Sequence, residues 1–260
     1  MFPFPIELGP VAISFYGVMV AVGVLAGLGL FGVTAPRRGL TAVQARDFCF
    51  WMILAGLAGS RFFYVIFHWP EFAGDTWWSV FAYWRGGLMF QGGLVGALAV
   101  SPFFLKRHGL KFWPTVDVMA PSLALGQCFG RLGCFAAGCC YGHVTGEDNP
   151  LAVTFPYGGL APADWPLWPV QLFESFGLLA LTLILLWAGR RPAFSRPGRV
   201  GALYLFGAGL LRLAMESFRG DFRGEAVIWN LPPTSLTAAD AVLLGLWLLR
   251  PKTRQTPSAA

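Results

Sequence analysis

The chain has 260 residues, of which 56% are hydrophobic and only 12% are charged. A soluble domain has about twice that share of charged residues, so the composition predicts a membrane protein with the lipid bilayer as a partner. The formal net charge is +6, but most lysines and arginines stand in short tracts between apolar runs, where a membrane topology signal lies. The charge therefore gives no support for nucleic-acid binding.

Seven apolar segments have roughly the 20 residues that a helix needs to cross a bilayer core. In chain order they are residues 11–33, 48–67, 86–105, 113–136, 168–189, 200–218 and 231–249. No lysine or arginine precedes the first segment, so it lacks the basic region of a cleavable signal peptide and should remain as a spanning helix. The sequence thus predicts an all-α, polytopic membrane protein with seven transmembrane helices.

The connecting segments alternate in positive charge along the chain. The segments on one face of the predicted membrane hold thirteen lysines and arginines in total, and those on the other face hold three. Because cytoplasmic loops carry the excess of lysine and arginine, the N-terminus is expected outside and the C-terminus in the cytoplasm. We expect residues 1–250 to form a single membrane domain, residues 137–167 to form a periplasmic loop or cap, and residues 251–260 to be a disordered cytoplasmic tail.

Seven polar side chains fall in the outer halves of the predicted helices. They are Tyr16, Arg61, Gln91, Arg131, Glu174, Arg212 and Glu216. Ionisable groups in spanning helices are costly, so each is a candidate functional residue. The three arginines outnumber the two glutamates, and this excess of positive charge suits an anionic headgroup that arrives from the outer leaflet. Asp117, near the inner end of its segment, is the exception.

Two of these features also have structural explanations. Arg212, Glu216 and Arg219 follow i, i+4, i+7 spacing, so Glu216 can pair with either arginine and could serve only packing. Arg131 has no acidic residue one turn away, which favours a functional role. The glycines beside Gln91 permit close helix packing, or close approach of the backbone to a ligand.

The five cysteines show no C-x2-C pair and no histidine cluster with zinc spacing, so the sequence predicts no metal site. No cofactor site is recognisable either. For Cys134, Cys139 and Cys140, two interpretations stay open. They are small packing residues, or they form a disulfide outside the cytoplasm.

The run from Gly130 to Gly142, GRLGCFAAGCCYG, resembles the signature of the prolipoprotein diacylglyceryl transferase family. Further matches occur in family order, at Phe15-Tyr16-Gly17, Gly59-Ser60-Arg61, Gln91-Gly92-Gly93, the run PVQLFE ending at Glu174, and the run RLAMESFR from Arg212 to Arg219. The resemblance covers about residues 11–249. It implies an enzyme of the bacterial plasma (inner) membrane whose active site faces the outer leaflet.

The resemblance also implies the substrates, which are phosphatidylglycerol and a prolipoprotein signal peptide. In this family the diacylglyceryl group moves to the lipobox cysteine thiol and glycerol-1-phosphate is released. Arg131 and Arg212 match the family's essential arginines and are expected to bind the phosphate and stabilise its charge as it leaves. The other expected substrate-binding residues are Tyr16, Arg61, Gly92, Gly93, Gly142, Glu174, Glu216 and Arg219.

The chain departs from the family pattern at a position of catalytic interest. Gln91 stands where many members have a histidine that is a proposed general base, and an amide cannot accept a proton near neutral pH. We keep Gln91 among the catalytic candidates. The thiolate could instead form because nearby arginines lower the pKa of the incoming thiol, or because His143 of the outer loop acts as the base.

Two other functions are compatible with part of this pattern. A divergent family member could act on another thiol or another lipid, as the replacement at Gln91 suggests. A membrane transporter also has intramembrane charges and glycine-rich helices. A transport pathway predicts polar residues that reach both faces of the membrane, whereas here they gather in the outer half.

Overall fold

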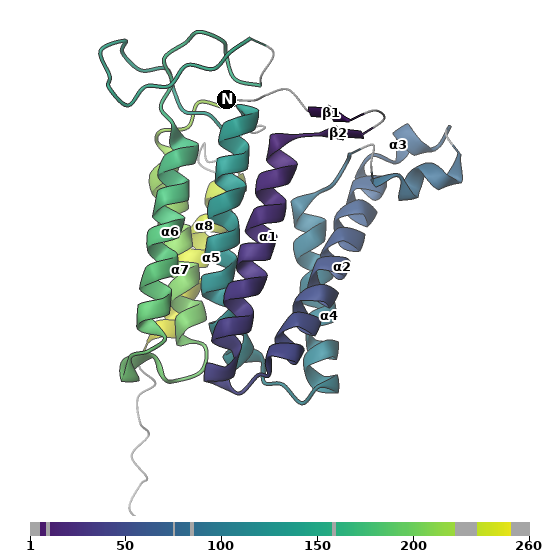
Figure 1. Cartoon of the computed structure of the whole chain (residues 1–260), viewed down its shortest axis with the longest axis vertical. Helices are drawn as coiled ribbons and strands as arrows, with labels where there is room; N and C mark the ends of the chain where they lie inside the picture. The colour runs from purple at the N-terminus through teal and green to yellow at the C-terminus, as the bar shows by residue number, and fades with distance from the viewer. Residues whose placement is uncertain are drawn as a thin grey trace, which may run out of the picture. The chain divides into compact units, whose positions relative to one another are not determined.

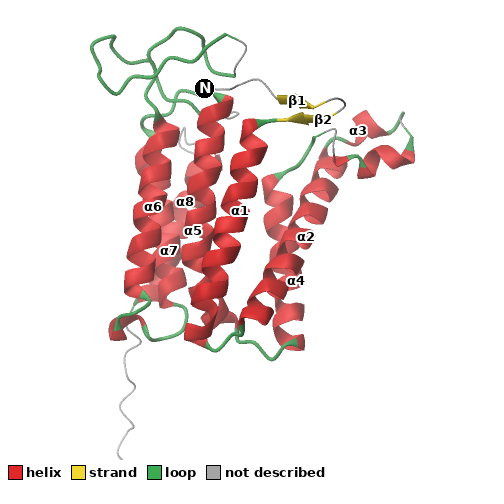
Figure 2. Cartoon of the chain, viewed as in Figure 1, coloured by secondary structure: helices red, strands yellow, loops and turns green. Residues whose placement is uncertain are grey.

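The structure is a computed structural model that describes residues 6–8, 11–74, 76–83, 86–157, 160–221 and 233–250. The described part is predominantly helical (Figures 1 and 2). Its long helices are α1 (Phe15–Thr34), α2 (Ala42–Phe67), α4 (Phe90–Arg107), α5 (Phe112–Ala137), α6 (Val170–Ala188), α7 (Arg199–Glu216) and α8 (Pro233–Leu249). A long helix therefore overlaps each of the seven predicted apolar segments.

The shorter elements connect the long helices. They are the helix α3 (Trp69–Phe72), the 3-10 helices η1 (Ala35–Arg38), η2 (Trp77–Phe81) and η4 (Pro192–Phe194), and the strands β1 (Ile6–Leu8) and β2 (Val11–Ile13). The two strands pair antiparallel, with Ile6 opposite Ile13. The predicted start of the first helix at residue 11 was therefore wrong, because β-branched Val11 and Ile13 join a hairpin and α1 begins at Phe15.

The second helix begins before its predicted start. α2 starts at Ala42 rather than at residue 48, because Thr41 and Gln44 form a capping box. The Thr41 hydroxyl accepts a hydrogen bond from the Gln44 N–H (3.1 Å), and the Gln44 side chain accepts one from the Thr41 N–H (2.9 Å). This reciprocal pair satisfies two N–H groups that a helix start leaves open. The prediction followed the apolar run alone and so missed the first turns.

Three stretches in the described part of the chain are long and apolar enough, by length and composition, to cross a membrane. They are Phe15–Arg38, Ala42–Phe67 and Val170–Ala188. Large apolar side chains such as Leu25, Phe62 and Phe103 are more than half exposed on three different helices. Apolar helices of this length that expose large apolar side chains are typical of proteins embedded in a bilayer, so these features confirm the prediction of a helical membrane protein.

The chain divides into two compact units, residues 31–115 and residues 1–30 with 116–260. In the first unit, α2 and α4 approach closely at Gly59, Gly92 and Gly96, where an added Cβ would collide with the backbone of the other helix. Small residues of this kind permit close packing of membrane helices. Phe48 packs its ring against Phe104 in the core of this unit, with centroids 5.5 Å apart.

In the second unit, α5, α6 and α7 share an apolar core. Its buried members are Ala120, Ala124, Leu181, Leu185 and Val200. Near the start of α5, the buried Asp117 carboxylate accepts hydrogen bonds from the Gly198 N–H (2.8 Å) and the Gly201 N–H (2.9 Å). These N–H groups lie at the start of α7, so Asp117 caps that helix, which explains a buried charge at this position.

The segment between α5 and α6 has a small core of its own. Phe155, Ala161 and Leu167 are buried together there. Val153 and Leu167 exchange two backbone hydrogen bonds of 3.0 Å. We expect this segment to be a periplasmic cap. Its described part has a defined shape because of this packing.

Candidate functional site

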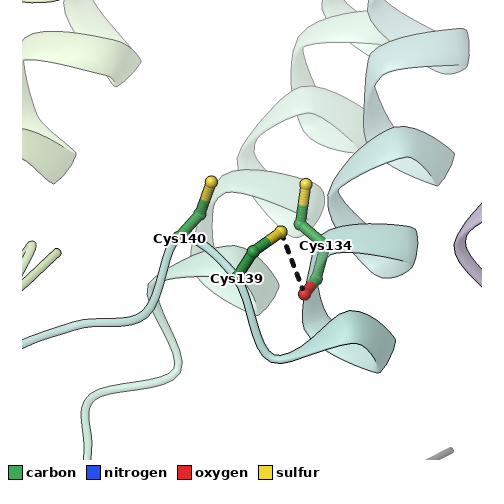
Figure 3. Close-up of side chains that lie close together, drawn as sticks. All are labelled: Cys134, Cys139 and Cys140. Atoms are coloured by element: carbon green, nitrogen blue, oxygen red, sulfur yellow. Dashed lines mark hydrogen bonds between the residues drawn. The ribbon is translucent and has the colours of Figure 1, made fainter. Parts of the chain in front are cut away.

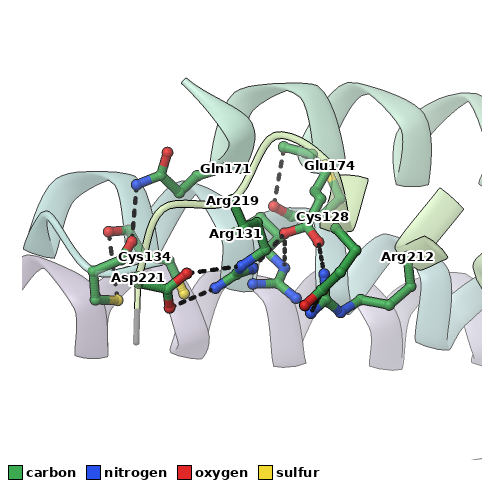
Figure 4. Close-up of polar contacts among 11 residues, drawn as sticks. Cys128, Arg131, Cys134, Gln171, Glu174, Arg212, Arg219 and Asp221 are labelled. Carbon is green, nitrogen blue, oxygen red and sulfur yellow. Dashed lines mark hydrogen bonds and ion pairs between the residues drawn. The ribbon is translucent and has the colours of Figure 1, made fainter. Parts of the chain in front are cut away.

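A buried carboxylate of α6, Glu174, gathers three arginines (Figure 4). Its Oε2 lies 2.8 Å from Nε of Arg131 and 3.6 Å from a terminal nitrogen of Arg219. Its Oε1 lies 3.5 Å from a terminal nitrogen of Arg212. Only 3% of the Glu174 side chain is exposed, so this carboxylate can stay ionised only because the arginines compensate for its burial. We name these four residues the Glu174 cluster.

Arg131, from α5, is the most exposed arginine of the cluster. A quarter (25%) of its side chain is accessible. Glu174 engages its Nε, and within the described residues the two terminal nitrogens of Arg131 have no partner. A guanidinium held by its Nε presents the terminal N–H groups as a planar fork, which matches a phosphate or carboxylate.

Arg212, from α7, is more fully engaged by acids. Its two terminal nitrogens pair with Glu174 (3.5 Å) and with Glu216 one turn further along α7 (2.5 Å). The predicted pairing of Arg212 with Glu216 is therefore present. Glu174 and Glu216 approach Arg212 from different helices, so the guanidinium has little freedom to rotate.

Arg219 follows the end of α7 and is held by a bidentate ion pair. Its Nε and a terminal nitrogen each lie 3.0 Å from a carboxylate oxygen of Asp221. The sequence analysis missed Asp221 because this residue lies outside the apolar segments. Asp221 changes the local charge, since three arginines now face three carboxylates, and the expected excess of positive charge is absent from this group.

Gly142 fixes the position of Arg219. The Gly142 N–H donates to the Trp168 carbonyl (3.1 Å), and Gly142 forms a backbone bridge with Arg219. An added Cβ would lie 2.5 Å from the Trp168 carbonyl oxygen and 2.8 Å from that of Phe218. Glycine is therefore required where these three segments cross, and its expected role in substrate binding stays a prediction.

One face of α6 supports the cluster. Gln171, Glu174 and Ser175 are all buried and share this face through their i, i+3, i+4 spacing. The Ser175 hydroxyl donates to the Cys128 carbonyl of α5 (3.0 Å), which holds the two helices together beside Glu174. The Gln171 amide nitrogen donates to the Cys139 carbonyl (2.8 Å), while its buried oxygen has no partner among the described residues.

Three cysteines lie beside the Glu174 cluster. Cys134, Cys139 and Cys140 are half-buried, and their sulfur atoms lie within 4.8 Å of one another (Figure 3). Hydrogen bonds from the other two thiols, together with the Arg219 guanidinium, lower the pKa of the Cys140 thiol. We name these three residues the cysteine cluster. The sequence groups these three cysteines, but the turn that brings their sulfur atoms together is not evident from it.

Tyr16 lies in the first turn of α1. Its side chain is 44% exposed, and its ring lies over Gly133 of α5, where an added Cβ would be 3.1 Å from the ring. Gly133 follows Arg131 by two residues. The structure thus brings Tyr16 close to the part of α5 that carries Arg131, and its expected contact with substrate stays a prediction.

Arg61 belongs to the other unit and is buried, with 4% exposure. It donates to four backbone carbonyls, those of Ser79 (2.7 Å), Val80 (2.8 Å), Gly86 (2.6 Å) and Gly87 (3.1 Å). Three rings also lie 5.4 to 5.9 Å from its guanidinium carbon, and they belong to Tyr64, Phe72 and Tyr83. This geometry makes Arg61 a clamp on the segment before α4, and its expected contact with substrate stays a prediction.

The remaining expected site residues lie at the start of α4. Gln91 is exposed. Gly92 and Gly93 face α2, since an added Cβ at Gly92 would lie 2.5 Å from the Gly59 carbonyl oxygen and one at Gly93 would lie 3.2 Å from that of Gly56. Helix packing thus accounts for both glycines, and their contact with substrate stays a prediction.

Comparisons with known proteins point to one family. Residues 3–250 match the family described as "Prolipoprotein diacylglyceryl transferase". A relative from Gloeobacter violaceus is 30% identical over 97% of this chain and 95% of its own length, and one from Synechocystis sp. is 30% identical over 95% and 89%. A relative from Acinetobacter baumannii is 33% identical over 95% and 91%. Each of the three is named phosphatidylglycerol–prolipoprotein diacylglyceryl transferase.

Proposed function

This chain belongs to the prolipoprotein diacylglyceryl transferase family, and we propose that it moves the diacylglyceryl group of phosphatidylglycerol to the lipobox cysteine of prolipoproteins. Glycerol-1-phosphate is the other product. The observation that carries this proposal is the arginine fork of Arg131, which Glu174 holds by its Nε and leaves open at its terminal nitrogens. A phosphodiester is the anion that such a fork receives best.

The proposed chemistry needs no nucleophile from the enzyme. The substrate thiolate attacks the glyceryl carbon that is bonded to the phosphate oxygen. A carbon–sulfur bond forms, the carbon–oxygen bond breaks, and its electron pair stays on the leaving phosphate. Arg131 binds the phosphate and takes up this developing charge, and Arg212 completes the site from α7.

The carboxylates position the arginines. Glu174 and Glu216 hold Arg212 from two sides, while Asp221 and Glu174 hold Arg219. Arginines fixed in this way do not have to reorganise when the phosphate develops charge, which is the main source of electrostatic stabilisation. Glu174, Glu216 and Arg219 are therefore positioning residues in this proposal.

The remaining expected residues have proposed roles of their own. Tyr16, whose ring lies against Gly133 on the helix that carries Arg131, binds the headgroup, and Gln91 acts as a hydrogen-bond donor that accepts no proton. Arg61, Gly92 and Gly93 shape the start of α4 so that Gln91 is presented. Gly142 holds the backbone of Arg219 in place.

The proposal includes a topology. All seven long helices cross the plasma membrane, with the N-terminus outside, the C-terminus in the cytoplasm and the Glu174 cluster facing the outer leaflet. The uneven distribution of lysine and arginine supports this orientation. The polar face of α6 occupies its first two turns, near the expected outer loop, which also agrees with it.

Transfer of labelled diacylglycerol from phosphatidylglycerol vesicles to a lipobox peptide tests the proposal. We expect transfer by the purified protein, no transfer to the same peptide with serine in place of its cysteine, and loss of transfer in Arg131→Ala. Arg190→Ala is the matched control, because Arg190 is an exposed arginine after the end of α6. Full transfer by a folded Arg131→Ala variant would refute the role of the fork.

A second candidate is a family member with another lipid or thiol substrate. Gln91 favours it, because the chain lacks the histidine that many members carry at this position. The same assay separates the two candidates when phosphatidylethanolamine and cardiolipin vesicles are added as donors. Preference for one of these lipids over phosphatidylglycerol would support the second candidate.

A further inference from the structure

The cysteine cluster is built by an unusual turn at the end of α5. Cys134 stands in the last turns of the helix. The chain then turns back because Gly138 (φ 70°) and Cys140 (φ 61°) both adopt a left-handed backbone conformation. A residue with a side chain rarely adopts this conformation, because its Cβ crowds the backbone. The turn that brings the three thiols together is therefore maintained against a local preference.

Several contacts hold this turn in place. The Cys139 N–H donates to the Cys134 carbonyl (3.1 Å), and the Cys139 thiol also points to that carbonyl (3.6 Å). The Cys139 carbonyl accepts a hydrogen bond from Gln171 of α6 (2.8 Å). Beyond Cys140, Gly142 is fixed between two neighbouring segments. The fold therefore holds the backbone of the three cysteines close together.

The geometry of three convergent thiols suits a metal ion better than a disulfide. A disulfide joins two sulfurs about 2.05 Å apart and has no use for the third. In a tetrahedral zinc site with zinc–sulfur bonds of about 2.3 Å, neighbouring sulfurs are about 3.8 Å apart. Since the sulfurs here lie within 4.8 Å of one another, each pair needs to close by at most about 1 Å.

Charge also favours such a site. Three thiolates and one zinc ion together carry one negative charge. Arg219 lies beside Cys140 and interacts with its sulfur, so a guanidinium is in place to offset that charge. Soft sulfur ligands select zinc or copper(I), and three protein ligands with an open fourth position are typical of catalytic zinc.

We propose that Cys134, Cys139 and Cys140 bind a zinc ion whose fourth coordination position takes the lipobox thiol of the incoming prolipoprotein. This inference rests on the proposed function. A thiol that coordinates zinc loses its proton to water, so the substrate arrives as the thiolate that the displacement needs. After the sulfur has bonded to the glyceryl carbon, the product is a neutral thioether, a weaker ligand that leaves the metal.

The position of the cluster fits this role. Cys140 interacts with Arg219, Arg219 lies 3.6 Å from Glu174, and Glu174 lies 2.8 Å from Arg131. The activated thiol and the phosphate-binding fork therefore lie on one connected set of side chains. A metal-bound thiolate also explains how transfer proceeds with Gln91 where many family members have a histidine, since no general base is required.

Metal binding can be measured without any transfer activity. The full-length protein is purified in the presence of zinc, and its metal content is determined by mass spectrometry. We expect about one zinc per chain, and affinity at least about 100-fold weaker in Cys140→Ser. Cys49→Ser is the matched control, because Cys49 lies in α2 in the other unit. Cys134→Ser repeats the test, and thermal unfolding shows that each variant is folded.

Cobalt(II) in place of zinc reports on the fourth position. We expect sulfur-to-cobalt absorption bands that gain intensity when the lipobox peptide is added and do not change with the peptide that has serine instead of cysteine. Absorption bands that change with neither peptide would overturn the assignment of the lipobox thiol as the fourth ligand. Absence of metal together with a chain about 2 mass units lighter, as a disulfide gives, would overturn the site itself.

The transfer assay separates this inference from the proposed function. Metal-free protein that transfers diacylglycerol as fast as the zinc form would keep the proposed function and refute the inference. Loss of transfer on removal of zinc, with recovery when zinc is returned, is the expected result. If the zinc form transfers nothing although the cobalt form responds to the peptide, the proposed function alone is refuted.

Discussion

Arg61 in α2 and Arg131 in α5 both project from apolar helices, yet their guanidinium groups have different partners. Arg61 donates to four backbone carbonyls and is stacked by three rings. Arg131 is held at one nitrogen by a carboxylate and has two terminal nitrogens without a partner among the described residues. A buried cation whose three nitrogens all donate to backbone carbonyls supports structure, whereas one with open terminal nitrogens can receive a ligand.

We expect the largest loss of transfer activity from a substitution at Arg131. Arg131→Lys keeps the positive charge but loses the planar fork and the Nε contact with Glu174, so we expect kcat to fall about 300-fold. The thermal unfolding temperature should change little. Initial rates over a range of phosphatidylglycerol concentrations give kcat and KM, with Arg190→Lys as the control. A loss of less than threefold would remove the distinction between the two arginines.

On the Arg61 side, we expect loss of stability rather than of chemistry. Arg61→Ala leaves four carbonyls without their donor, which should lower the free energy of unfolding by about 3 kcal/mol. Transfer per folded molecule should stay within a few-fold of the original protein. Denaturant unfolding in detergent measures the first quantity, and Arg107→Ala, an exposed arginine at the end of α4, is the control. Unchanged stability with lost kcat would place Arg61 in the catalytic site.

The family resemblance ranks Arg131 above Arg61, but the apolar pattern alone could not show why, because depth in an apolar segment says nothing of the partners of a side chain. The carbonyls that satisfy Arg61 come from residues 79–87, about one loop away, and no residue type marks a free carbonyl. Asp221 was missed for a related reason, since it follows the last apolar residue of its segment. The position of Glu174 was predicted because a carboxylate in an apolar helix is conspicuous.

The helices themselves were largely predictable, because membrane thickness sets the length of an apolar segment. The largest errors lie at helix starts, and two of them, at residue 11 and residue 48, have a clear physical cause. There, hydrogen bonds decide the boundary, those of a short hairpin at Val11 and those of a capping box at Thr41. A hydropathy pattern does not report hydrogen bonds, so it shows neither the hairpin nor the capping box. The left-handed conformation of Cys140, which creates the cysteine cluster, is invisible for the same reason.

Glu174→Gln tests whether the carboxylate is what holds Arg131 with its terminal nitrogens open. A neutral amide still fits the space but cannot hold Arg131, Arg212 and Arg219 as a carboxylate does, so we expect kcat/KM to fall about 30-fold. The arginines should then bind inorganic phosphate less selectively. Kinetics of transfer measure the loss, and Glu147→Gln in the exposed loop is the control. Unchanged kinetics would mean that the arginines hold their geometry without Glu174.

The smallest effect is expected at Asp117, a second buried carboxylate that differs from Glu174 in its partners. Asp117 accepts hydrogen bonds from the Gly198 and Gly201 N–H groups and caps α7. In Asp117→Asn one oxygen can still accept, but the amide NH2 faces the other N–H group, so the free energy of unfolding should fall by about 1 kcal/mol. Transfer per folded molecule should be unchanged, because the cap lies at the opposite end of α7 from Glu216. Thermal unfolding and transfer are measured side by side, with Asp148→Asn, an exposed loop acid, as the control.

A carboxylate whose partners are neutral backbone donors thus stabilises the fold, while one whose partners are arginines sets the geometry of the site. A loss of transfer without a loss of stability in Asp117→Asn would contradict that division.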